Sequence, residues 1–174
     1  MLLPSLTLVL GGAACGKSAF AESLVVAGCD NPTYIATAQV FDDEMAAKVV
    51  RHQNMRGDGW FTIEEPLDIS AAIASAPADR PILIDCATLW LTNVILGDHD
   101  LTEHKARFLQ AITNASDAVV VVSNEVGQGI VPDNALSRQF RNAQGQLNQD
   151  IARAADLVVT VMAGLPLALK GTLP

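Results

Sequence analysis

The feature that most constrains the fold is the segment GGAACGKS at residues 11–18. Gly11, four further residues and then Gly16, Lys17 and Ser18 match the pattern G-x-x-x-x-G-K-[ST]. This pattern is typical of a loop whose backbone N–H groups surround a phosphate. An apolar segment precedes the loop and a helix-like segment follows it, and the helix would present its positive end to the anion. The sequence therefore predicts a P-loop within an α/β fold.

Short apolar segments alternate with helical segments along the whole chain. Several apolar segments are β-branched runs without polar alternation, which is typical of strands buried on both faces of a parallel sheet. The alternation predicts right-handed crossovers and a three-layer fold, a mainly parallel sheet with helices on both faces, in a single domain over residues 1–174. The predicted strands are 6–12, 33–38, 59–65, 81–87, 118–124 and 157–164, and the predicted helices are 17–28, 42–56, 67–76, 102–115 and 133–155.

Composition and charge exclude several classes of protein. The net charge of −8 leaves no basic surface for nucleic acid. Uncharged stretches are broken by Gly, Pro, Ser or Thr well short of a membrane span, and the N-terminal segment lacks the basic region of a signal peptide. Three cysteines without CxxC spacing fit a reducing compartment. We therefore expect a cytoplasmic protein that binds phosphates through loop amides, a few cations and a metal.

The phosphate loop and a later carboxylate predict a nucleotide site with Mg²⁺. Lys17 would contact the β- and γ-phosphates, and the Ser18 hydroxyl would ligate the metal. The apolar strand PILID ends at Asp85, where P-loop proteins carry a metal-binding acid, although many strands end in Asp only to start a turn. These features do not specify a reaction, and the guanine-reading N-K-x-D motif is absent. The predicted loop contacts to the nucleotide are Gly11, Gly12, Ala13, Ala14, Cys15, Gly16, Lys17 and Ser18.

A histidine between two cations distinguishes the predicted helix at 42–56. At helical spacing, Lys48, His52 and Arg56 lie along one stripe. The flanking cations disfavour the imidazolium form, so they favour the neutral, nucleophilic ring near pH 7. They would also hold an α-phosphate and stabilise charge as pyrophosphate leaves. From these residues alone, a solvated helix face is nevertheless favoured over a chemical role.

Three further segments, taken with the phosphate loop, resemble a known family. They are residues 34–56, 122–149 and 152–170, with YIATAQVFDDEMAAKVVRHQNMR as the first. Over nearly the whole chain the sequence is similar to the bifunctional adenosylcobinamide kinase/adenosylcobinamide-phosphate guanylyltransferase family of cobalamin biosynthesis. The resemblance implies that ATP or GTP phosphorylates the aminopropanol hydroxyl of adenosylcobinamide. GTP then gives GMP to that phosphate through a guanylylated histidine, which yields adenosylcobinamide-GDP and pyrophosphate. A RecA-like sheet and a homotrimer are also implied.

The resemblance places the nucleotide-carrying histidine at His52. This chain departs from the family at Ala14 and Cys15, where a basic residue and a serine are frequent. It also has Arg51 in place of a second histidine, and Asp85 where Glu is frequent, so metal distance or nucleotide preference is open. Besides the loop and Asp85, the predicted nucleotide-binding residues are Thr37, Ala38, Gln39, Gln53, Asn54, Met55, Arg56 and Glu64.

Four residues are candidates for binding the corrinoid substrate. Asn124 and Glu125 end an apolar strand, where they would face the corrinoid or the metal, and the glycines that follow allow close approach of backbone to a ligand. A loop that merely redirects the chain is the alternative. Arg138 and Arg141 are three residues apart on the next predicted helix and would hold a phosphate or a carboxylate of another subunit.

Two other functions stay open at the level of sequence. In the first, the chain is a single-function small-molecule kinase in which His52 is inert, which leaves the cationic stripe unexplained. In the second, it is a nucleotide-gated binding module, for which 174 residues leave little room for a docking surface.

Overall fold

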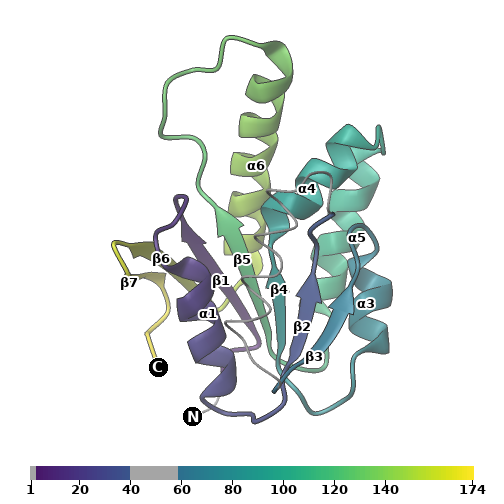
Figure 1. Cartoon of the computed structure of the whole chain (residues 1–174), viewed down its shortest axis with the longest axis vertical. Helices are drawn as coiled ribbons and strands as arrows, with labels where there is room; N and C mark the ends of the chain where they lie inside the picture. Colours follow the sequence, from purple (N-terminus) through teal and green to yellow (C-terminus); the bar gives the residue numbers. More distant parts are fainter. Residues whose placement is uncertain (1–2, 40–58) are drawn as a thin grey trace.

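The computed structural model describes residues 3–39 and 59–174. The helices are α1 (Lys17–Val26), α3 (Ile69–Ser75), α4 (Ala87–Leu96), α5 (Leu101–Thr113) and α6 (Ala135–Ala154). The strands are β1 (Leu6–Gly11), β2 (Thr33–Ala36), β3 (Phe61–Glu64), β4 (Ile82–Asp85), β5 (Val119–Asn124), β6 (Leu157–Met162) and β7 (Leu165–Lys170). They form one sheet in the order β3-β2-β4-β5-β1-β6-β7, in which every described pair is parallel except β6–β7 (Figure 1).

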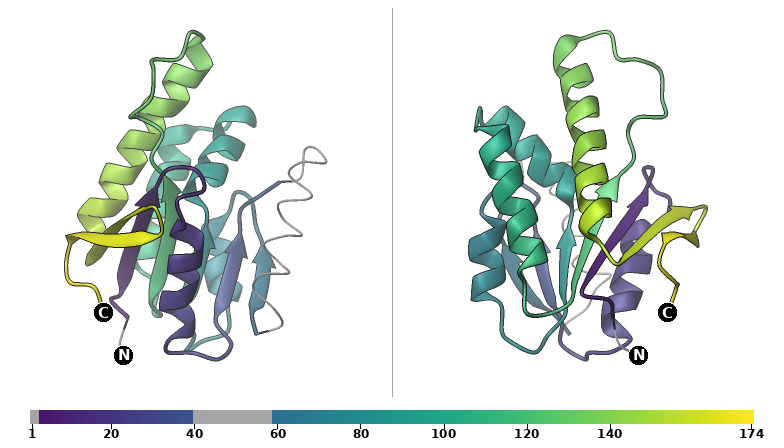
Figure 2. Two further views of the ribbon diagram at one scale, coloured as in Figure 1. Left: turned by 60° about the vertical axis from the view of Figure 1, so that its left-hand side comes forward. Right: turned by 180° about the vertical axis from the view of Figure 1, so that it is seen from behind.

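Both faces of the sheet are buried, which explains the uniformly apolar strands. In β1, Leu8 packs into the cluster shared with α3, α4, α5 and α6, whereas Val9 packs into the cluster shared with α1. Successive side chains of a strand point to opposite faces, so a strand covered on both sides needs apolar residues at every position. Figure 2 shows α1 on one face and the other described helices on the opposite face. The predicted three-layer arrangement is confirmed.

The sequence prediction missed helix α4. It begins two residues after β4 ends, so no loop-like segment separates the two elements. Ala87, Trp90, Leu91 and Val94 are all buried, and the helix therefore lacks the polar face that gives an amphipathic period.

The prediction also merged β6 with part of the hairpin that follows it and missed β7. Ala163 and Gly164 both have positive φ, 53° and 78°, and they turn the chain between the paired residues Met162 and Leu165. A two-residue hairpin loop of this geometry usually carries Asn-Gly or Asp-Gly, so the Ala-Gly pair gave a weak signal. The predicted helix at 42–56 lies outside the described residues.

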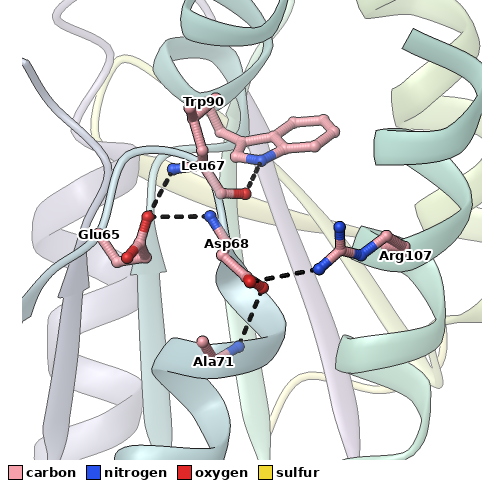
Figure 3. A network of polar contacts seen from close by, with 6 residues as sticks. All are labelled: Glu65, Leu67, Asp68, Ala71, Trp90 and Arg107. Atoms are coloured by element: carbon pink, nitrogen blue, oxygen red, sulfur yellow. Dashed lines mark hydrogen bonds and ion pairs between the residues drawn. The ribbon is translucent and has the colours of Figure 1, made fainter. Parts of the chain in front are cut away.

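Polar contacts fix the connection between β3 and α3 (Figure 3). The Glu65 carboxylate accepts hydrogen bonds from the N–H groups of Leu67 and Asp68, each at 2.9 Å. Asp68 caps α3 and forms an ion pair with Arg107 of α5 at 3.2 Å. The indole of Trp90 in α4 donates to the Leu67 carbonyl at 2.9 Å. Residues from three helices thus hold the chain directly after β3.

Candidate nucleotide and corrinoid site

The parallel strands end at the same edge of the sheet, where most of the predicted site residues lie (Figure 1). The register pairs Gly11 with Asn124 across β1 and β5, and Ala36 with Asp85 across β2 and β4. The phosphate loop, Asp85 and the residues after β2 and β5 are therefore brought to one edge. In open α/β sheets, ligands bind at the carboxyl ends of the strands.

Two glycines of the phosphate loop are required by its geometry. Gly16 has φ of 95° and precedes the first residue of α1, a left-handed conformation that disfavours other residues. A Cβ at Gly11 would meet the sulfur of Cys15 and lie 2.7 Å from the carbonyl oxygen of Val161. The loop therefore folds tightly against the end of β6 and leads directly into the N-terminus of a helix, a favourable position for an anion.

Backbone hydrogen bonds hold the loop on two sides. The Glu125 N–H donates to the Gly11 carbonyl at 3.0 Å, which ties the loop to the end of β5. The Gly164 N–H donates to the Cys15 carbonyl at 2.8 Å, which ties it to the β6–β7 hairpin. Cys15 thus packs within the loop against Gly11, and its side chain is half-buried.

The Lys17 side chain lies back across its own loop. Its ammonium group donates to the carbonyl of Gly12 at 3.1 Å. This contact keeps the cation beside the loop amides, where the terminal phosphates of a nucleotide would replace the carbonyl as its partner.

The buried thiol of Cys86 directly follows Asp85 and is influenced by the charges of Asp85 and Lys17. The pKa of Cys86 is raised to about 12, first by burial and then by the charge of Asp85, while the charge of Lys17 acts in the opposite direction. Electrostatic effects of this kind fall off with distance, so both charged groups lie near this thiol. With such a pKa Cys86 stays protonated at neutral pH and is not a nucleophile.

The donor set suits Mg²⁺. Ser18 and Asp85 offer hard oxygen ligands, and Mg²⁺ typically takes one or two protein oxygens and fills its other positions with phosphate oxygens and water. Among the described residues, no group of three or more His, Cys, Asp or Glu side chains could hold a metal by itself. A protein site this sparse fits a metal that arrives with its nucleotide.

Thr37 has a structural role that the sequence did not reveal. Its hydroxyl accepts from the Cys86 N–H and donates to the Cys86 carbonyl, both at 2.8 Å. Asn93 of α4 donates to the Thr37 carbonyl at 2.8 Å and to the Pro66 carbonyl at 3.0 Å. The fully buried Thr37 side chain therefore joins the ends of β2 and β4, directly before the predicted nucleotide contacts Ala38 and Gln39. In the sequence, the one weak indication of this role of Asn93 is its polar amide within an otherwise apolar segment.

Glu64 lies at the opposite end of the site from the phosphate loop. It ends the edge strand β3, and three strands separate β3 from β1. At about 4.8 Å per strand, the two strands lie about 19 Å apart. Glu64 is exposed and neighbours Ala36, after which the chain continues through Thr37, Ala38 and Gln39. His52, Gln53, Asn54, Met55 and Arg56 lie outside the described residues.

The four candidate substrate residues differ in their surroundings. The backbone of Asn124 is held by Thr88 and Asn148, at 2.8 and 3.0 Å. The Glu125 carboxylate accepts from the Gly127 N–H in its own loop. Arg138 donates to the carbonyls of Pro132 and Asp133, at 3.0 and 2.7 Å, and so stabilises the start of α6. Arg141 instead lines a groove between α4 and α6.

Comparison with known proteins identifies the family. Residues 7–169 match the family model described as cobinamide kinase / cobinamide phosphate guanyltransferase. The chain belongs to this family. It is therefore a transferase with both activities, a kinase and a nucleotidyltransferase of adenosylcobalamin biosynthesis. The kinase/guanylyltransferase resemblance inferred from the sequence is confirmed.

Curated relatives match along almost their entire length. The bifunctional adenosylcobalamin biosynthesis protein CobP of Pseudomonas aeruginosa is 42% identical over 167 residues, which cover 94% of this chain and 96% of CobP. CobU of Escherichia coli is 36% identical over 179 residues, which cover 94% of this chain and 98% of CobU.

A solved structure supports the fold. It is an ATPase domain that superposes with a TM-score of 0.51 at 13% sequence identity, covering 90% of this chain and 69% of that domain. At this identity the likeness concerns the fold alone. The expected RecA-like arrangement of P-loop ATPases is confirmed.

Proposed function

We propose that the carboxyl edge of the sheet phosphorylates adenosylcobinamide with ATP or GTP and then converts the product to adenosylcobinamide-GDP. The observation that carries the proposal is the meeting of the phosphate loop, Lys17 and Asp85 at one edge, around Cys86. In the first reaction the aminopropanol hydroxyl oxygen attacks the γ-phosphorus and releases its proton to solvent, the bond to the bridging β–γ oxygen breaks, and the nucleoside diphosphate leaves. Lys17 and the loop N–H groups would stabilise the charge on the transferred phosphoryl group.

In this proposal Ser18 and Asp85 hold Mg²⁺, directly or through water. When bound, the metal would neutralise negative charge on the phosphates of the nucleotide. Of the other predicted nucleotide contacts, Thr37, Ala38, Gln39 and Glu64 lie near the ends of β2 and β3, apart from the loop.

For the second reaction we assign His52 as the nucleophile. An imidazole nitrogen attacks the α-phosphorus of GTP, the bond to the bridging α–β oxygen breaks, and pyrophosphate leaves. An oxygen of cobinamide phosphate then attacks the same phosphorus, the P–N bond breaks, and the neutral ring is regenerated. Covalent catalysis of this kind divides one difficult transfer into two easier steps. Its support is the cationic stripe that the sequence predicts for Lys48, His52 and Arg56, together with the family assignment.

We further infer that one domain carries both reactions, in the cytoplasm, as a homotrimer. In the described part of the chain no helix is long and apolar enough to cross a membrane. An apolar surface supports association of copies, since Leu165, Leu167 and Leu169 alternate along the edge strand β7 and are all exposed.

Product analysis tests the proposal. The protein is incubated with adenosylcobinamide, Mg²⁺ and either ATP or GTP. The corrinoid products are then separated and identified by mass spectrometry. With GTP, adenosylcobinamide phosphate forms first and adenosylcobinamide-GDP follows with release of pyrophosphate. If the phosphate accumulates with excess GTP and no pyrophosphate appears, the chain acts as a kinase alone.

A further inference from the structure

A mostly apolar groove lies between α4, α6 and the connection from β5 to α6. Its volume is about 430 Å³, within the range of small-molecule sites. Its walls include Ile95, Leu96, Val126, Leu136 and Phe140, and Arg141 places a guanidinium group among them.

The groove lies close to the strand ends that carry the phosphate loop. Val126 follows Glu125, whose N–H donates to the Gly11 carbonyl at 3.0 Å. The other wall belongs to α4, which begins two residues after Asp85. At 1.5 Å per helical residue, Thr92 and Leu96 lie about 8 and 14 Å along α4 from its first residue. Figure 1 shows α4 and α6 extending beyond the strand ends on this side.

We propose that this groove binds one edge of the corrin macrocycle of cobinamide and of its phosphate. The proposal rests on the proposed function and adds a substrate site to it. The acceptor hydroxyl is at the end of an aminopropanol arm, so the macrocycle has to lie beside the phosphate loop while the arm reaches it. A groove that includes Val126, next to Glu125, and that runs outward along α4 has this placement.

The side chains of the groove suit the chemistry of a corrin edge. This edge carries methyl groups, which would pack on Leu96 and Leu136, and amide side chains whose carbonyl oxygens would accept from Arg141. Arg141 forms no ion pair with the described residues, so its guanidinium can donate hydrogen bonds to a ligand in the groove. Leu96 and Leu136 are 61% and 50% exposed, so the fold itself does not require them to be apolar.

A second copy of the chain is the competing occupant. On the same connection, Ile130 and Val131 are 97% and 61% exposed, and such apolar residues also suit a contact between proteins. They do not line the groove, however, whereas Arg141 does. Small-molecule sites are typically concave and apolar with a few polar groups in their walls, as in this groove with Arg141. The corrinoid is therefore favoured over a second copy of the chain.

Two variants and two matched controls test this site. Leu96→Gln/Leu136→Gln removes the exposed apolar wall, and Arg141→Gln removes the cation. Val26→Gln makes a comparable apolar-to-amide change at an exposed position, the last residue of α1. Arg80→Gln removes an arginine two residues before β4, at the opposite end of the strands from the phosphate loop. Adenosylcobinamide binding is followed by its visible absorption, the KM for nucleotide by the kinase assay, and the association state by sedimentation.

We expect each groove variant to weaken adenosylcobinamide binding about tenfold, with an unchanged KM for nucleotide, unchanged sedimentation and controls like the wild type. Unchanged corrinoid binding in both groove variants overturns the site. Weakened binding together with dissociation of the assembly also overturns it, since the groove then belongs to the contact between copies. A wild type that neither binds nor phosphorylates adenosylcobinamide instead contradicts the proposed function, before any variant is compared.

Discussion

At the scale of residues, the phosphate loop depends on one cation. Lys17 contacts only the Gly12 carbonyl among the contacts described for its ammonium, so Lys17→Ala should leave the fold intact. We expect kinase activity to fall about 10²- to 10³-fold, because the variant loses a preorganised charge at the transferring phosphoryl group. Initial rates of adenosylcobinamide phosphorylation measure this. Cys15→Ser, a change within the same loop, is the control and should retain activity; a near-normal rate for Lys17→Ala would refute its role.

Thr37 gives a prediction about stability at the same scale. Thr37→Val keeps the shape of the side chain but leaves the N–H and carbonyl of Cys86 without their hydroxyl partner. We expect the free energy of unfolding to fall by about 1–3 kcal/mol, the cost of unpaired buried polar groups. Urea denaturation measures it, with Thr113→Val as control because that hydroxyl is exposed. Equal effects of the two substitutions would show that the buried contacts add nothing.

At the scale of elements, an ion pair network joins α5 to α6. The pKa of Asp150 is lowered, first by its hydrogen bond to Lys105 and further by Arg153 and Gln146. Because the folded pKa lies below the unfolded value, the stabilisation is present above the unfolded pKa, near 3.9, and is lost as pH falls through the folded pKa. We expect Asp150→Asn to destabilise the protein by about 0.5–1 kcal/mol at pH 7 and by less towards pH 3.

Denaturation at several pH values tests this dependence. Asp30→Asn changes an exposed carboxylate that has no ion pair among the described residues, and it should show no such pattern. A deficit for Asp150→Asn that is constant from pH 7 to pH 3 would assign the effect to packing instead.

The elements also show what could be predicted from the sequence. Buried parallel strands and the G-x-x-x-x-G-K-S loop were predictable because each depends on local composition. Helix α4 was missed because burial on most sides removed its amphipathic period, and β7 because an Ala-Gly turn is a weak hairpin signal. The roles of Thr37 and Asn93 depend on contacts between residues far apart in the sequence, which a local pattern does not encode. Arg138 differs from Arg141 because it binds the nearby carbonyls of Pro132 and Asp133, and the spacing of the two arginines did not indicate this.

At the scale of the whole molecule, we expect the chain to act as a homotrimer. The exposed leucines of β7 and the apolar residues near Ile130 leave surface that copies could cover. Sedimentation equilibrium at assay concentration should give three times the chain mass. A stable monomer with full kinase and guanylyltransferase activity would contradict this expectation.

The central claim is that one chain joins two reactions through a covalent nucleotide on His52. The most direct measurement is intact-protein mass after incubation with α-labelled GTP and Mg²⁺. We predict a gain of one GMP with release of pyrophosphate, on a P–N bond that mild acid cleaves and base does not. His52→Ala should lose the adduct and the guanylyltransferase activity yet keep kinase activity, since Lys17, Ser18 and Asp85 remain. An adduct that persists in His52→Ala, or a wild type that never takes up GMP, would contradict the assignment of His52 as the nucleophile.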